Sequence, residues 1–160
     1  MNRKNKIWHH PLFQACCREI AKEETGRIFC RHDVNHLLDV ARLMMILNDK
    51  EQLHIDEDII YAAALVHDIG RHLQYQKGIG HDIASALIAP KILRECGFKQ
   101  HEINTIVQAV LKHRCKAAKK EAGLSSLLYR ADKMSRACFA CAARHLCNWP
   151  DDKKNLKINY

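Results

Sequence analysis

The chain has 160 residues, of which 48% are hydrophobic, and it carries a formal net charge of +8 at pH 7. This length suits one domain with a sizeable core, and the apolar content excludes wholesale disorder. The longest apolar stretch, 59–66, is too short to span a bilayer, and no apolar segment of the secretory type follows the basic N-terminus. We therefore expect a cytoplasmic protein without a membrane partner.

Six segments of the chain combine apolar residues at helical spacing with residues that begin or end helices. Alanine, leucine and isoleucine dominate the apolar residues, and only six glycines and three prolines interrupt the chain, which favours helices over strands. In chain order, we predict helices over about Pro11–Glu24, Asp33–Leu47, Asp56–Gly70, His81–Cys96, Gln100–Lys112 and Ser125–His145. Pro90 should kink or interrupt the fourth of these helices.

No internal repeat, low-complexity tract or linker separates these segments. The sequence therefore predicts an all-α fold, in which about six helices form a single bundle over residues 1–150. The last ten residues, 151–160, are rich in charge, and we expect them to form a frayed C-terminal tail.

The doublet His67-Asp68 closes the most hydrophobic of the predicted helices, directly after the apolar run 62–66. An ionisable pair in such a place is costly to bury unless a partner neutralises or coordinates it. The doublet is therefore either an exposed helix end at the Gly70 turn or part of a binding site.

Four further residues accompany the doublet from other predicted helices: His36, His81, His113 and Asp132. Each of them alone is more often a satisfied polar residue than a ligand. Together with the doublet they provide four imidazoles and two carboxylates on several helices, which is how helix bundles build metal sites. Such a ligand set suits iron, manganese, zinc, cobalt or nickel, and a mixed nitrogen and oxygen set with positions left for water is catalytic in character.

The order of these residues resembles a known signature. His36, then His67-Asp68, then Asp132 is similar to the H…HD…D pattern of the HD-domain superfamily of metal-dependent phosphohydrolases. The local contexts also match: 36–41 resembles the first-ligand helix, 67–71 the HD-Ile-Gly form of the doublet, and 131–133 the last-ligand helix. The resemblance covers about residues 30–137.

The resemblance implies a helical bundle with the metal site at its centre. His36, His67, Asp68 and Asp132 would hold one ion, and His81, His113 and a bridging Asp68 would hold a second. It also implies hydrolysis of a small phosphate ester or nucleotide by metal-activated water, with one or two divalent ions of iron, manganese, nickel, cobalt or zinc as cofactors. Asp68, Lys133 and Arg71 are then the candidate catalytic residues, and Arg136 is a further candidate contact to phosphate.

Two other functions use similar residues. The six ligands also resemble those of HD-fold mixed-valence di-iron oxygenases, and a regulatory HD domain would bind a nucleotide without turnover. The stretch 112–136 holds eight basic and two acidic side chains, which is either a solvated helix face or a field that attracts anions. It favours a small anionic phosphorylated partner. Nucleic acid is disfavoured, because no aromatic residues are interleaved to stack bases.

The eight cysteines suggest metal binding, reactive thiols or packing rather than disulfides, because the cytosol keeps thiols reduced. Cys138, Cys141 and Cys147 form a cluster, and Cys30 lies six residues before His36 as Cys138 lies six after Asp132. If the two helices are antiparallel, all four cysteines reach one end of the bundle. They are a candidate second site for zinc or an iron–sulfur cluster, and packing of small side chains is the alternative.

Overall fold

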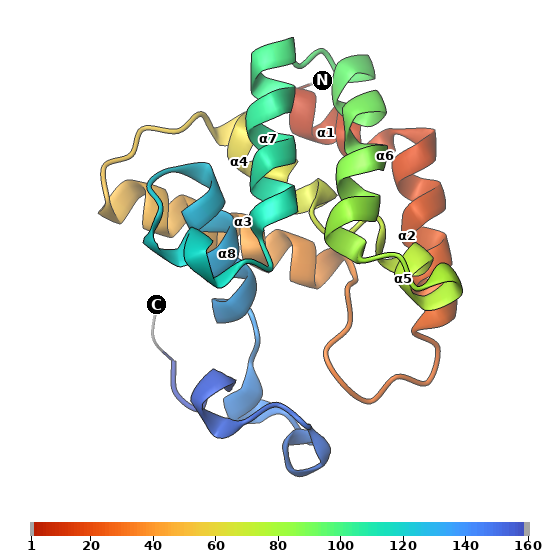
Figure 1. The fold of residues 1–160 in the computed structure, drawn as a ribbon, viewed down its shortest axis with the longest axis vertical. Coiled ribbons are helices and arrows are strands. Elements are labelled where there is room, and N and C mark those ends of the chain that lie inside the picture. The colour runs from red at the N-terminus through yellow and green to blue at the C-terminus, as the bar shows by residue number, and fades with distance from the viewer. Residues whose placement is uncertain (1, 159–160) are drawn as a thin grey trace.

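The computed structural model describes residues 2–158, and in that range every regular element is a helix, which confirms the predicted fold class (Figure 1). The elements are α1 Arg3–His9, α2 Pro11–Glu23, α3 Val34–Lys50, α4 Glu57–Val66, α5 Arg71–Lys77, α6 His81–Glu95, α7 Gln100–Lys112, η1 Lys116–Lys120, α8 Leu124–Met134, η2 Cys138–Ala140, η3 Arg144–Leu146 and η4 Asp151–Lys153, where η marks a 3-10 helix. Within residues 2–158, no helix has both the length and the apolar character needed to cross a membrane.

Helix α4 lies in the middle of the bundle and contacts α1, α3 and α7 on different sides. Ile60 and all residues of 62–66 are buried, and three of the latter are alanines, whose small side chains let the neighbouring helices approach. The Asp56 side chain caps the helix by accepting the backbone N–H groups of Asp58 and Ile59. The most buried helix of the fold thus ends directly before the doublet His67-Asp68 and delivers it to the interior.

Gly70 allows the turn after this doublet to lie against α6. Its backbone N–H donates to the Ser85 hydroxyl at 2.9 Å. A Cβ atom placed on Gly70 would lie 2.4 Å from the Ser85 nitrogen and 2.6 Å from the Ala84 Cβ. Only glycine fits such a contact, so the turn is held in close register with the helix that begins at His81.

Two short helices, α1 and α5, were outside the six predicted segments. Helix α1 buries only Ile7 and α5 buries no residue, so neither carries the repeated apolar spacing that indicates a helix. Charges hold α1 in place instead: the Arg3 guanidinium contacts Asp56 at 3.2 Å, Asp58 at 3.1 Å and Glu102 at 2.9 Å.

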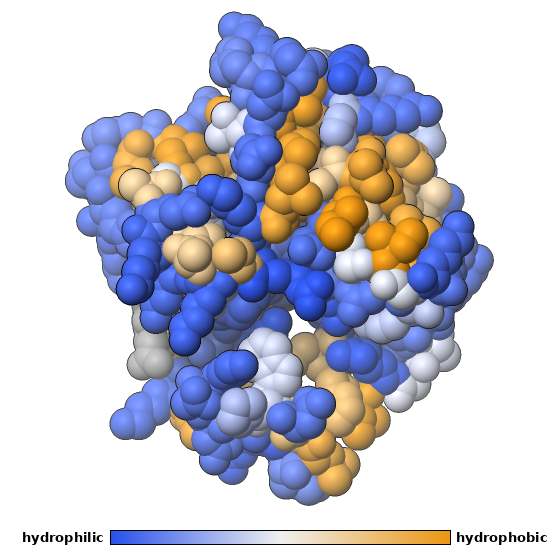
Figure 2. Space-filling model, in the orientation of Figure 1, coloured by the Kyte–Doolittle hydropathy of each residue, from blue (hydrophilic) through white to orange (hydrophobic). Residues whose placement is uncertain are grey.

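Pro90 does not interrupt α6, which runs continuously from His81 to Glu95. A proline inside a helix costs about 3 kcal/mol. The helix is buried on both sides of this proline, at Ala86 and Ala89 before it and at Ile92 and Leu93 after it. Packing on both sides of Pro90 therefore offsets the lost backbone hydrogen bond. Figure 2 shows hydrophobic side chains on the outside of this helix as well, where Leu87 is 76% exposed.

The predicted end of the last long helix at His145 is wrong, because α8 ends at Met134. The Asn155 side-chain amide donates to the carbonyl oxygens of Lys133, Met134 and Arg136 at 2.6, 3.2 and 2.9 Å. These bonds satisfy carbonyl groups that a longer helix would otherwise use. They also show that the expected frayed tail is fastened to α8 at Asn155.

Replacing Gly70 with alanine should lower the free energy of unfolding by about 1–3 kcal/mol, because the added methyl group meets α6 backbone atoms that cannot rotate away. Urea unfolding followed by circular dichroism measures this loss. Gly80→Ala is the matched control, since the nearest atom to its new Cβ is the movable Asp82 carboxylate. Equal stability of Gly70→Ala and the wild type would contradict the close contact.

Candidate metal centre

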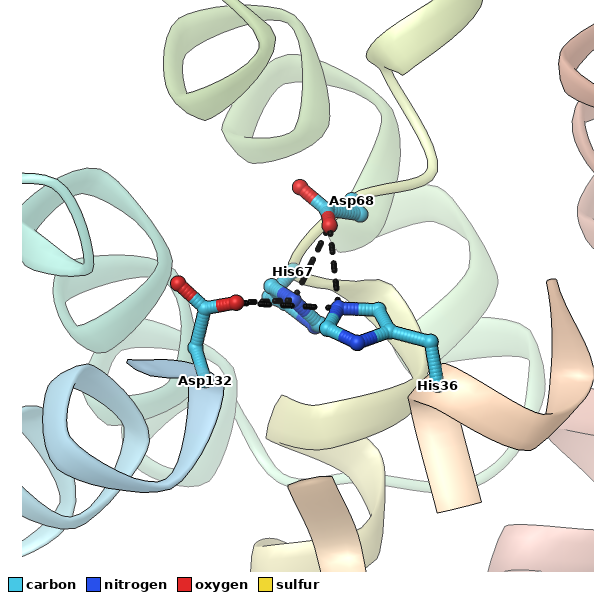
Figure 3. A group of neighbouring side chains, drawn as sticks. All are labelled: His36, His67, Asp68 and Asp132. Atoms are coloured by element: carbon cyan, nitrogen blue, oxygen red, sulfur yellow. Dashed lines mark ion pairs between the residues drawn. The ribbon is translucent and has the colours of Figure 1, made fainter. Parts of the chain in front are cut away.

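Six buried or mostly buried side chains meet inside the bundle and form two groups that share Asp68. They come from α3, α6 and α8 and from the residues directly after α4 and α7. The first group is His36, His67, Asp68 and Asp132, and the second is Asp68, His81 and His113. Within each group the candidate ligand atoms lie within 4.8 Å of one another, and no other three His, Cys, Asp or Glu side chains of residues 2–158 do so. Figure 3 shows the first group.

The two oxygens of the Asp68 carboxylate face different groups. Oδ2 lies 3.1 Å from Nε2 of His67 and 3.4 Å from Nε2 of His36. Oδ1 lies 3.3 Å from Nε2 of His81 and 3.7 Å from Nε2 of His113. One carboxylate therefore stands between two sets of imidazoles, which is the placement expected of a bridging ligand.

Hydrogen bonds on the far side of each ring select the tautomer that presents Nε2 to the centre. His67 Nδ1 donates to the Ala64 carbonyl at 2.7 Å, and His113 Nδ1 donates to the Val110 carbonyl at 2.5 Å. Both acceptors are backbone oxygens, so the proton must sit on Nδ1. The Nε2 lone pair of each neutral ring is then free for a ligand bond.

His36 and His81 follow the same pattern with side-chain acceptors. The Ser135 hydroxyl donates to the Asp132 carbonyl at 2.8 Å, so it accepts from His36 Nδ1 at 3.3 Å. Gln74 Oε1 lies 2.5 Å from His81 Nδ1 and also accepts the His81 backbone N–H. Metal-binding histidines are oriented by such bonds from their second ring nitrogen.

These tautomers leave several acceptors facing one another without protons between them. Nε2 of His36, Nε2 of His67 and Oδ1 of Asp68 are buried without a hydrogen-bond partner. Nε2 of His81 and Nε2 of His113 lie 3.1 Å apart. An unpaired buried polar group costs about 1–3 kcal/mol, and divalent cations satisfy several such acceptors at once. The residues present therefore fit metal ions of the kind that nitrogen and oxygen ligands bind.

The charge states suit the same purpose. Burial lowers the pKa of His81 to about 3, and burial also lowers the pKa of His113, so both rings are neutral at pH 7. Burial opposes ionisation of Asp68, but the neighbouring His67 outweighs it and holds the Asp68 pKa well below its usual range. Burial also lowers the pKa of His67, yet the adjacent carboxylates outweigh it and the net shift is upward. A proton at His67 Nε2 thus competes with a cation for the same lone pair.

The HD domain family matches residues 33–148, a range that contains all six of these side chains. The chain belongs to the HD domain family. An uncharacterized protein of Clostridium beijerinckii is 41% identical over 160 residues, and the alignment covers 100% of both chains. The crystal structure of a predicted HD superfamily hydrolase from an uncultured Thermotogales bacterium has a TM-score of 0.63 and 19% identity, and the match covers 98% of this chain and 88% of that one. That likeness shows the HD fold.

One further histidine of this HD domain, His32, lies beside the site although the sequence pattern did not indicate it. Its Nε2 lies 3.9 Å from Asp68 Oδ2, and its ring stands edge-on to that of His36. Its Nδ1 forms a hydrogen bond with the buried Glu24 carboxylate. Burial opposes ionisation of Glu24, but the bond to His32 outweighs burial and lowers the Glu24 pKa to about 2. His32 is four residues before His36, but it precedes the helix cap Asp33, so helical spacing could not place it.

The three cationic residues predicted to contact phosphate have different surroundings in the structure. Arg71 Nη1 lies 2.8 Å from Nδ1 of His81, and the Lys133 ammonium forms an ion pair with Asp132. Arg136 lies instead over the Trp149 ring, 3.9 Å from its centroid. Other members of the basic stretch 112–136 form ion pairs with acidic side chains outside both ligand groups: Lys112 with Glu121, Arg114 with Asp82 and Arg130 with Glu51.

The four cysteines of the candidate second site do lie in one region. Cys30 and Cys138 line two hollows there, one together with Cys147 and the other together with Cys141. However, no three of their sulfur atoms lie within 4.8 Å of one another in the described chain, and all four thiols are free. The structure therefore does not assemble the zinc or iron–sulfur ligand set that the spacing suggested. Because α8 ends at Met134, Cys138 is not carried forward along a helix as the prediction required.

If each group holds one ion, substitutions in the two groups should change the metal content in different ways. Asp68→Asn should abolish binding of both ions, because this carboxylate belongs to both groups. Asp132→Asn should remove one ion and His113→Ala the other. Titration of metal-stripped protein with cobalt(II), followed by elemental analysis of the desalted protein, measures the stoichiometry. Asp49→Asn, at the exposed end of α3, is the control. Two bound ions in Asp68→Asn would refute the sharing of Asp68.

Proposed function

We propose that this HD domain is a metal-dependent hydrolase that releases phosphate from a small phosphate ester or a nucleotide. The observation that carries this proposal is the division of the Asp68 carboxylate between two groups of imidazole ligands. Sites with two metal ions about 3.5–4 Å apart are typical of phosphatases and nucleases. The Thermotogales protein that shares the fold is described as a predicted HD superfamily hydrolase, which supports the reaction class.

The ligand assignment follows the two groups. One ion would be held by His36, His67, Asp68 and Asp132, and the other by Asp68, His81 and His113. Divalent ions bound there would lower the pKa of water and neutralise charge on the phosphoryl oxygens. Iron, manganese, cobalt, nickel and zinc all suit these ligands. Binding and orienting the phosphate then fall to the cationic side chains around the centre.

Arg71 is the residue that we expect to touch the phosphate. Its Nη1 lies at the edge of the second group, beside His81, and its Nε donates to the Tyr75 hydroxyl at 3.2 Å. The Tyr75 hydroxyl in turn donates to Glu24 at 2.8 Å, which holds the arrangement. A guanidinium fixed in this way presents its remaining N–H groups to phosphate oxygens as a planar fork, and its charge stabilises the transition state.

Lys133 acts on the reaction through Asp132. Burial opposes ionisation of Asp132, but the Lys133 ammonium beside it holds the pKa of that carboxyl below its usual range. Lys133 Nζ also lies 3.5 Å from the His113 backbone oxygen. We therefore assign Lys133 as a positioning residue, which keeps Asp132 ionised and oriented toward the imidazoles of the first group.

The same ligands suit a mixed-valence di-iron oxygenase, and a regulatory domain could bind a nucleotide without turnover. The Arg71 guanidinium at the edge of the centre donates to the neutral Tyr75 hydroxyl and forms no ion pair with a carboxylate of the described residues, which favours an anionic substrate. The complete set of six ligands favours turnover over binding alone. We also propose a cytoplasmic location, because all eight cysteines are free thiols.

Metal-stripped protein reloaded with manganese, cobalt, nickel or iron should release phosphate from at least one member of a panel of phosphomonoesters, nucleotides and phosphodiesters. Chelation with EDTA should abolish this activity. Arg71→Gln should lower kcat/KM about 10- to 100-fold at unchanged metal content, because one charge-assisted contact to the phosphate is lost. Arg94→Gln, an exposed cation on α6, is the control. Oxygen consumption on a polyol or phosphonate, with no phosphate released from any ester, would transfer the assignment to the oxygenase.

A further inference from the structure

A hollow of about 140 Å³ adjoins the metal centre, between the loop before α3 and the C-terminal segment. Figure 2 shows the molecule hollowed above the C-terminal segment, with hydrophilic residues around the opening. Four cationic side chains line the hollow, namely Arg27, Arg71, Arg136 and Lys154. In the described chain no aspartate or glutamate lines it. The lining therefore carries an excess of positive charge.

The charge of the three arginines is not neutralised by the groups that hold them. Arg27 Nε donates to the Cys30 carbonyl at 2.8 Å, and Arg71 Nε donates to a tyrosine hydroxyl. The Arg136 guanidinium lies over the Trp149 ring, which fixes its plane and leaves the N–H groups at its edge for an anion. Only Lys154 has an acidic partner, since its Nζ lies 3.1 Å from the Asp151 carboxylate, whose side chain is 80% exposed.

Two residues belong both to the hollow and to the surroundings of the metal centre. His32 lines the hollow and has its Nε2 at 3.9 Å from Asp68 Oδ2. Arg71 lines the hollow and has its Nη1 at 2.8 Å from His81 Nδ1. A ligand whose phosphate lies at the ligand groups can therefore extend past these two side chains toward Arg27 and Arg136.

The size of the hollow limits what it can accept. Its volume exceeds the roughly 30 Å³ that one water occupies, so it has room for a phosphate-sized group. It is smaller than the roughly 300–1,000 Å³ of pockets that enclose a drug-sized ligand. A small, strongly anionic group therefore fits the volume of the hollow, and it meets the charge of the lining cations, which a nucleobase would leave without a counter-charge.

We propose that this hollow is an anion subsite that binds a second phosphate of the substrate, so that the preferred substrates are compact phosphate esters with two phosphate groups. The identity of the reacting phosphate rests on the proposed function. Anion binding by Arg27 and Arg136 does not, because neither residue belongs to the ligand groups. The two ideas can therefore fail separately.

Isothermal titration of metal-free protein in EDTA with inorganic pyrophosphate tests the subsite without catalysis. The wild type should bind, and the double variant Arg27→Gln/Arg136→Gln should bind about 10- to 100-fold more weakly, because two charged contacts are lost. Lys91→Gln/Arg94→Gln, two exposed cations on α6, is the control matched in net charge. If circular dichroism shows that the double variant is unfolded, each single variant should still show a several-fold loss. Equal binding by folded variants and wild type would overturn the subsite.

Steady-state kinetics of the metal-loaded enzyme separate the subsite from the proposed function. The double variant should raise KM about tenfold or more for a sugar bisphosphate and leave KM for p-nitrophenyl phosphate unchanged. An equal rise for both substrates would overturn the assignment of a second phosphate. If the double variant loses pyrophosphate binding but the wild type hydrolyses no ester, the subsite is upheld and only the proposed reaction is rejected. If an oligonucleotide binds more tightly than pyrophosphate, and the double variant loses this oligonucleotide binding, the small-anion assignment is overturned.

Discussion

The burial of the Asp68 carboxylate among imidazoles is the constraint on which the rest of the structure depends. Its position requires α4 to run through the core, and the apolar sequence of that helix accomplishes this. It also requires a tight turn, which Gly70 provides by lying against α6. Hydrogen bonds that the Nδ1 atoms of the four histidines donate then direct their Nε2 lone pairs toward the carboxylate. Fold, turn and tautomer together prepare acceptors that only cations or protons can satisfy.

The helices that bury an apolar face were predictable from the sequence, because spacing and capping residues are local signals. Helices α2, α3, α4, α6 and α7 begin and end near their predicted bounds. Helix α1 depends on ion pairs of Arg3 with distant acidic residues, and the end of α8 depends on Asn155, about twenty positions further along the chain. Such long-range contacts leave no periodic pattern, so the sequence could not indicate them.

For the site, the order of the histidines and aspartates identified the six residues that the fold brings together, but not how Asp68 divides its oxygens between two groups. The net charge of the stretch 112–136 was a poor guide, because three of its cations form ion pairs with acidic residues outside the two ligand groups. The unpaired cations that line the hollow beside the centre come from three separate segments, at Arg27, Arg71 and Arg136, and only Arg136 belongs to that stretch. The cysteine hypothesis assumed that α8 continues past Met134, and a helix that stops there removes its geometric basis.

The proposed sharing of Asp68 between two metal ions is tested most directly by an anomalous-difference map from crystals grown with manganese(II) or cobalt(II). Two peaks are expected on opposite sides of the carboxylate, one beside Nε2 of His36 and His67 and the other beside Nε2 of His81 and His113. A map with no peak at Asp68, or with its only peak among the cysteines, would contradict this arrangement.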